Sequence, residues 1–83
     1  MLPLVLLAGL ALAEDIPVPL DQLPPPVKAA LLARWPGATL LAAEREGAVY
    51  DVMLRTVANE RWEAEVTPEG IIRDAEREDD NQE

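Results

Sequence analysis

Carboxylates are the side chains best able to carry chemistry here, because 16 of the 83 residues are Asp or Glu. Glu60, Glu63 and Glu65 lie close together in the sequence, and on a strand Glu63 and Glu65 would share one face. A glycosidase needs two carboxylates about 5 to 9 Å apart in a cleft. A chain this short has little room for a sugar-sized cleft. A solvated sheet face, charge-paired with Arg55 and Arg61, is therefore the favoured interpretation.

The residue types that are missing exclude most enzyme mechanisms. The chain has no Ser and no Cys, so the usual nucleophiles are lacking, and no His, the usual general base and transition-metal ligand. Without Cys there is also no disulfide framework. We therefore predict that the chain is not an enzyme, and that it has no catalytic residues, no cofactor and no dedicated metal site.

A second group of carboxylates lies near the C-terminus. Ca²⁺ is bound by oxygen ligands, but the spacing matches no EF-hand loop, because no Gly marks the sharp turn. We expect weak ion association with a disordered acidic tail at residues 78–83, and we keep cation or small-ligand binding by the acidic sheet face and tail as the alternative function. The residues of this group are Asp74, Glu76, Glu78, Asp79 and Asp80.

Net charge and composition narrow the class of partner. The formal net charge is −9, which repels nucleic acid and anionic lipid, so we predict no nucleic-acid partner. With 49% hydrophobic residues the chain is too apolar for a disordered acidic segment, and its length suits one small domain. A basic or cationic partner would suit such a surface, although acidity also serves solubility alone.

The first residues have the pattern of an export signal. Residues 2–12 are apolar apart from Pro3 and Gly9, and Ala11 and Ala13 form a small-x-small cleavage motif. No Lys or Arg precedes the run, so either the signal is minimal or the true start lies upstream of Met1. The alternative is a buried or interfacial hydrophobic segment. We predict a signal peptide over residues 1–13, cleavage after Ala13, and a periplasmic or secreted protein. The run is shorter than the roughly 20 residues of a membrane span, so no stable span is expected after cleavage.

Prolines and a Trp-Pro-Gly motif delimit one helix. Residues 14–24 are predicted to form an extended, Pro-rich lead-in. A helix is expected over residues 25–34, with Asp21 or Gln22 as its cap and one apolar face. Pro36 disfavours helical geometry at Trp35, and Gly37 can take the left-handed conformation that ends a helix. The chain should therefore reverse and lie back across the helix.

Four strands are expected after this reversal, over residues 39–46, 49–56, 61–66 and 71–76. The middle two alternate, so that Tyr50, Val52 and Leu54 would face the helix while Asp51, Met53 and Arg55 face solvent. Leu40-Leu41 and Ile71-Ile72 break this alternation, which a bulge or exposed apolar residues would explain. Short turns favour an antiparallel meander. The predicted fold class is α+β, with one helix packed on a four-stranded sheet in a domain over residues 25–77.

The order of these parts resembles the PepSY-like domain family, the group similar to the repeat unit of the secreted β-lactamase inhibitor protein. The motifs that carry the resemblance are LPPPVKAALLARWPGATL, the strand around Tyr50, WEAEV, and the turn TPEG before Ile71-Ile72. Trp35 stands where Tyr or Phe is commoner, and the 56–60 link has no Gly. The resemblance implies an exported protein that binds rather than catalyses. It also suggests a role in restraining peptidases.

We expect any partner to be another periplasmic or secreted protein; the sequence does not give the oligomeric state. Trp35, Tyr50 and Trp62 are expected to form much of the core, unless one Trp is an exposed anchor. Met53, between two charged neighbours on the solvent face, suits an adaptable contact, although isolated exposed apolar residues are common. The predicted contact residues are Asp51, Met53, Arg55, Arg61, Glu63 and Glu65.

Overall fold

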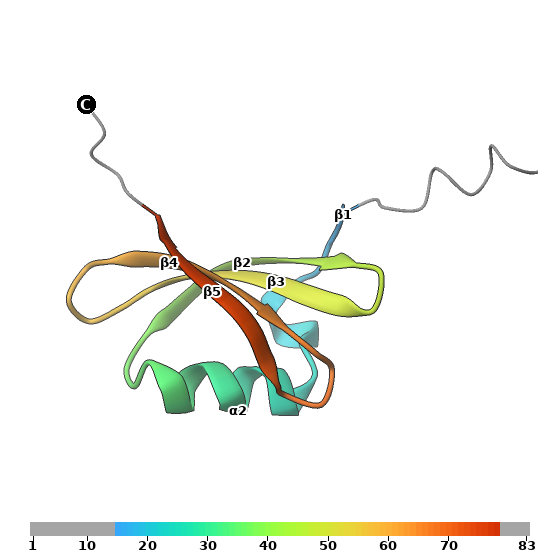
Figure 1. Cartoon of the computed structure of the whole chain (residues 1–83), viewed down its shortest axis with the longest axis horizontal. Coiled ribbons are helices and arrows are strands. Elements are labelled where there is room, and N and C mark those ends of the chain that lie inside the picture. Colours follow the sequence, from blue (N-terminus) through green and yellow to red (C-terminus); the bar gives the residue numbers. More distant parts are fainter. Residues whose placement is uncertain (1–14, 79–83) are drawn as a thin grey trace, which may run out of the picture.

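The computed structural model describes residues 15–78, and in it one helix packs on one face of an antiparallel sheet (Figure 1). The elements are strand β1 (Asp15–Pro17), the 3₁₀ turn η1 (Leu20–Gln22), helix α2 (Pro25–Arg34), and strands β2 (Thr39–Glu46), β3 (Val49–Arg55), β4 (Arg61–Val66) and β5 (Ile72–Glu78). The predicted α+β class, single helix and antiparallel meander are confirmed. The predicted signal peptide lies outside the described residues.

The sheet has five strands in the order β1-β2-β3-β4-β5, so the prediction of four was wrong. The additional strand, β1, falls in the segment expected to be an unpaired lead-in, and Ile16 pairs with Arg45 of β2. Proline is compatible with an edge strand when its missing N–H would face outward. The N–H of Val18 donates to the carbonyl oxygen of Ala43, so the alternation of the ladder directs the missing N–H of Pro17 away from β2.

Helix α2 has the predicted bounds and ends as predicted. The N–H of Trp35 still donates to the carbonyl oxygen of Leu31, while Gly37 takes φ +79° and reverses the chain. The predicted caps, Asp21 and Gln22, were wrong. They belong to η1, and Pro24 occupies the N-cap position without a side-chain hydrogen bond. Prolines in the first helical turn lack the N–H group that such a cap would satisfy.

The core lies between α2 and the sheet. Val27 and Leu31 of the helix meet Val52 and Leu54 of β3 and Ala64 and Val66 of β4, and all these side chains are fully buried. The expectation of a largely aromatic core was wrong, since the aromatic residues are only partly buried at its edge. Trp35 and Trp62 lie there with ring centroids 5.5 Å apart, and the indole N–H of Trp62 reaches Glu60 at 3.3 Å.

Two bulges account for the strands whose alternation was unclear. The register of β2 on β3 shifts between Leu40 and Ala42, which leaves Leu41 as an extra residue. The register of β4 on β5 shifts between Glu65 and Val66, which leaves Arg73 extra on β5. Strand β5 also continues to Glu78, beyond the predicted end at residue 76, and residues 79–83 of the predicted tail lie outside the described residues.

Candidate functional site

The sheet face turned away from α2 carries a dense group of carboxylates. Residues paired across antiparallel strands share a face. Asp51 of β3 pairs with Glu44 on one side and with Glu65 on the other, and Glu65 in turn pairs with Asp74. We call this set of side chains the acidic face. Its members are Asp15, Glu44, Glu46, Asp51, Glu63, Glu65, Asp74, Glu76 and Glu78.

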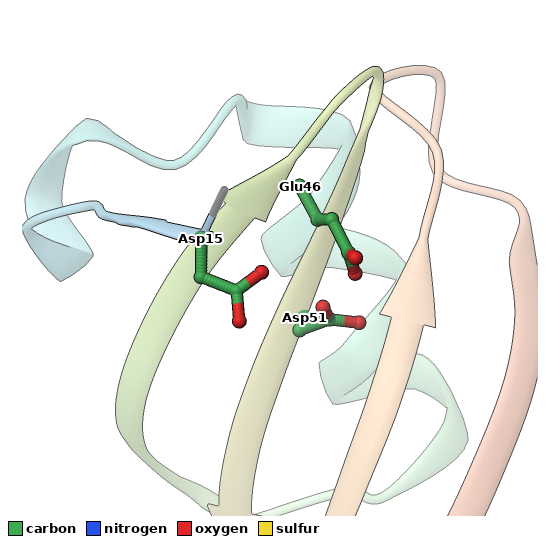
Figure 2. A group of neighbouring side chains, drawn as sticks. All are labelled: Asp15, Glu46 and Asp51. Carbon is green, nitrogen blue, oxygen red and sulfur yellow. The ribbon is translucent and has the colours of Figure 1, made fainter. Parts of the chain in front are cut away.

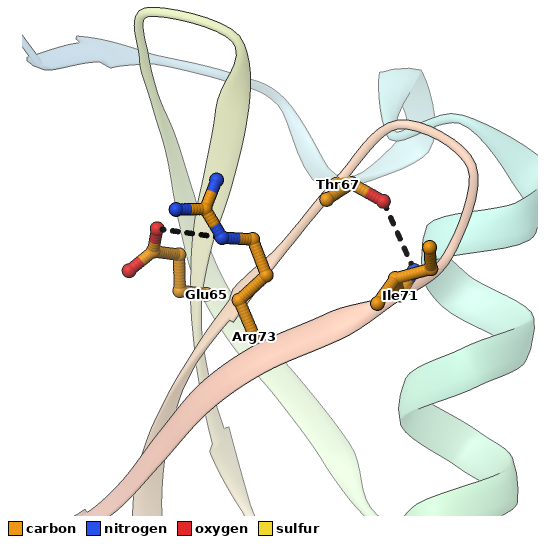
Figure 3. A network of polar contacts seen from close by, with 4 residues as sticks. All are labelled: Glu65, Thr67, Ile71 and Arg73. Atoms are coloured by element: carbon orange, nitrogen blue, oxygen red, sulfur yellow. Dashed lines mark hydrogen bonds and ion pairs between the residues drawn. The ribbon is translucent and has the colours of Figure 1, made fainter.

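All six predicted contact residues lie on this open side of the sheet, in three cross-strand pairs. These are Asp51 with Glu65, Met53 with Glu63, and Arg55 with Arg61. The expected pairing of Glu63 and Glu65 with Arg55 and Arg61 was wrong. The two arginines oppose each other at one end of this face, and the other neighbour of Arg61 is Glu78. Within residues 15–78 the one ion pair joins Arg73 to Glu65 at 3.8 Å, and Arg73 is the bulge residue of β5 (Figure 3).

Sequence analysis named Asp74, Glu76 and Glu78 only as a C-terminal group, and it did not place the outer carboxylates on this face. In both outer strands the carboxylates occupy alternate positions, a pattern that indicates one shared sheet face. They are Glu44 and Glu46 in β2 and Asp74, Glu76 and Glu78 in β5. Their face could not be assigned because both strands contain a bulge, and Asp15 belongs to the strand that was not predicted. Glu60, which was grouped with Glu63 and Glu65, instead accepts the hydrogen bond from Trp62.

The middle of the acidic face is an open hollow of about 260 Å³ in which every lining residue is acidic. Partial burial, together with the negative charges of Glu63, Glu46, Glu65 and Asp15, raises the pKa of Asp51 to about 6. Burial is also the main cause that raises the pKa of Glu63, followed by the charges of Glu78 and Glu76. Like charges held together in this way favour a bound cation or a cationic side chain.

A small apolar spot lies beside this hollow. Met53 is half-buried and pairs with Ala42 of β2, and together with Ala43, Glu44, Asp51 and Glu63 these side chains line a second, smaller hollow. An apolar floor with carboxylates around it suits a Lys or Arg side chain, whose aliphatic stem packs on apolar surface while its charge reaches outward.

One corner of the acidic face has the spacing of a cation site. Asp15, Glu46 and Asp51 come from three adjacent strands, and each can bring one carboxylate oxygen within 4.8 Å of the others (Figure 2). Ca²⁺ takes oxygen ligands at about 2.3 to 2.6 Å and accepts bidentate carboxylates. Exposed acidic groups also gather without binding an ion, so the geometry alone does not make this corner a metal site.

The turn before β5 holds that strand in place with local hydrogen bonds. The Thr67 hydroxyl oxygen accepts from the N–H of Ile71 at 3.1 Å, and the N–H of Thr67 donates to the carbonyl oxygen of Ile71 (Figure 3). Gly70 takes φ +98° and completes the predicted Thr-Pro-Glu-Gly turn.

Comparison with protein-family models, with curated proteins and with solved structures finds no match to this chain. The resemblance to the PepSY-like family therefore depends on the sequence motifs and stays a prediction. In residues 15–78, no helix is long and apolar enough to cross a membrane.

Proposed function

We propose that this protein is an exported, non-catalytic binding module whose acidic face takes a basic segment of another periplasmic or secreted protein. The observation that carries the proposal is the gathering of carboxylates from all five strands on the one sheet face that α2 leaves open. The proposal that the protein is exported depends on the signal peptide predicted over residues 1–13.

Charge complementarity supports a basic partner. Among residues 15–78, three arginines offset the nine carboxylates of this face: Arg55 and Arg61, which both lie at one end, and Arg73, which pairs with Glu65. Complementary charge brings specificity and fast association, and it makes binding sensitive to salt. Met53 and Ala42 add an apolar contact for the stem of a Lys or Arg side chain. Restraint of a peptidase is the role that the PepSY-like resemblance suggests for such a module.

A charge-matched pair of variants tests this proposal. The 83-residue protein is used after mild crosslinking to capture partners from its own envelope extract, with mass spectrometry as the readout. Glu63→Gln with Glu65→Gln removes two charges from the acidic face. Asp21→Asn with Glu69→Gln removes two exposed charges from η1 and from the turn before β5. We expect the first variant to lose the partner and the second to keep it. Equal capture by both variants would rule out the acidic face.

Cation binding is the second candidate function, and the Asp15, Glu46 and Asp51 corner is the observation in its favour. A ligand that binds only the folded state raises the melting temperature by mass action. We expect millimolar Ca²⁺ to raise the Tm of the wild type and of Glu69→Gln, and to raise it less in Glu46→Gln. An unchanged wild-type Tm would remove this candidate.

A further inference from the structure

Within residues 15–78, strand β5 is a free edge of the sheet, and it is the longer of the two edges. It has seven residues, whereas the other edge strand, β1, has three and ends in Pro17 (Figure 1). In the described part of the chain, β5 pairs with β4 alone. A long edge strand presents unpaired N–H and C=O groups that an extended segment can pair with.

The hydrogen-bond alternation identifies which groups of β5 are available. The N–H of Thr56 donates to the carbonyl oxygen of Glu60, so in β4 the even-numbered residues bond to β3 and the odd-numbered ones bond to β5. Their partners on β5 are Asp74, Glu76 and Glu78, whose backbone groups are thereby used. Ala75 and Arg77 lie between them, and their N–H and C=O groups are directed to the free edge.

The side chains of β5 select the chemistry of an added strand. Asp74, Glu76 and Glu78 project onto the acidic face, and Glu65 and Glu63, the direct partners of Asp74 and Glu76, lie one strand further in. On an added antiparallel strand, the residues opposite these three acidic positions would form non-hydrogen-bonded pairs, in which side chains approach most closely. Basic residues at every second position would therefore each meet a carboxylate.

The same pattern disfavours a second copy of this chain at the edge. If two β5 strands paired within one continuous sheet with their open faces on the same side, acidic residues would oppose acidic residues. Like charges directly opposite each other destabilise a strand pair. The acidic residues of β5 thus disfavour pairing with a second copy of the chain but allow pairing with a basic segment.

We propose that β5 binds its partner by strand addition, pairing with an extended segment that carries Lys or Arg at alternating positions. This inference deepens the proposed function and rests on it, since it names the form of the basic segment and the edge at which it binds. Backbone hydrogen bonds from Ala75 and Arg77 hold the added strand, and the acidic face selects its charged side chains.

Synthetic peptides test the inference with the 83-residue protein. The probe is the peptide TKVKVKT, and its binding is measured by calorimetry at low salt. Methylation of its two Val amides removes the N–H groups that would bond to β5, whereas methylation of two Lys amides removes N–H groups that would point away. We expect Val methylation to weaken binding about tenfold and Lys methylation to change it less than about twofold. The same residues in the order TVVKKKT should bind more weakly than TKVKVKT.

A second test changes the β5 edge of the protein instead of the peptide. Arg77→Pro removes one outward N–H, and Arg77→Ala makes the same charge change while keeping that N–H. Both variants make the protein more acidic, so attraction by charge alone would strengthen the binding of TKVKVKT to each. We expect Arg77→Pro to weaken binding and Arg77→Ala to preserve it. The methylated peptides decide the matter if Arg77→Pro fails to fold.

The possible outcomes separate the two proposals. Equal binding of both methylated peptides would overturn strand addition, but the proposed function would stand as long as the binding remains sensitive to salt. Failure of the wild type to bind TKVKVKT at low salt would overturn both proposals. A stable dimer of the wild type that excludes the peptide would assign the edge to a second copy and also overturn the inference.

Discussion

Asp51 and Glu63 lie diagonally across β3 and β4 on the acidic face, because Asp51 pairs with Glu65 while Glu63 pairs with Met53. Among the charges near Asp51, Glu63 contributes most to raising its pKa, after the larger effect of burial. The folded protein therefore holds these two carboxylates together at a cost that is relieved when one of them takes up a proton.

This cost predicts that stability rises as the pH falls. The pKa of Asp51 is about 6 in the folded protein, above the ordinary value of 3.8, so between these values the folded state binds more protons than the unfolded state. The free energy of unfolding must then increase as the pH falls through about 6. We expect thermal unfolding to give a higher Tm at about pH 5 than at about pH 7.5.

Asp51→Asn tests the origin of this pH dependence. It removes the charge, so we expect it to raise the Tm at neutral pH by about 3 °C, equivalent to about 0.5 kcal/mol, and to flatten the rise on acidification. The effect is modest because the carboxylate is partly solvated. Asp21→Asn, on exposed η1, is the control and should keep the wild-type slope. If Asp51→Asn also kept it, the slope would originate elsewhere.

The turn between β3 and β4 contains no glycine, and Asn59 takes the left-handed conformation that a glycine would usually provide. Asn59 takes φ +67°, and the Thr56 hydroxyl oxygen accepts hydrogen bonds from the N–H groups of Ala58 and Glu60. Asn tolerates this left-handed region better than most residues. We expect Asn59→Ala to cost about 1 kcal/mol and Asn59→Gly to cost nothing or to stabilise slightly, as measured by urea unfolding. Equal losses in the two variants would mean that the Asn side chain, and not φ, matters.

Much of the fold follows from local signals that agree with one another. Prolines begin α2 and Trp35-Pro36-Gly37 ends it, and alternation in β3 and β4 assigns Val52 and Ala64 to the helix side. These signals are strong because each depends on the chain within a few residues. The placement of the six predicted contact residues on the open face was predictable to the same extent, since all six belong to β3 and β4, while their role in binding stays a prediction.

The remaining parts depend on contacts that local sequence does not encode. Strand β1 forms because β2 offers an edge, and its prolines by themselves predict only an extended chain. The bulges at Leu41 and Arg73 shift the face of every residue beyond them, so the carboxylates of β2 and β5 could not be assigned by alternation. The pairing of the strands is needed to show that these carboxylates come together around Asp51.

Two adjacent leucines of α2 provide a test of the core. Leu31 is fully buried against the sheet, whereas Leu32 is 41% exposed. We expect Leu31→Ala to cost about 3 kcal/mol and Leu32→Ala less than about 0.5 kcal/mol. A domain of this size has little stability to spare, so Leu31→Ala should bring it close to unfolding at room temperature. Urea titration followed by Trp fluorescence measures both, and similar losses would contradict the packing of α2 on β3 and β4.

Gly70 has no side chain, which allows the turn before β5 to pack closely against the start of α2. A Cβ at this position would lie 2.7 Å from the carbonyl oxygen of Pro26, and φ is +98°, where side chains are strained. Gly47 also has positive φ, at +62°, but a Cβ there would meet nothing within 4 Å. We expect Gly70→Ala to cost about 3 kcal/mol, from backbone strain and steric overlap together, and Gly47→Ala about 1 kcal/mol, from strain alone. Urea unfolding of the two variants separates the contributions, and equal losses would mean that the turn moves away from Pro26 without cost.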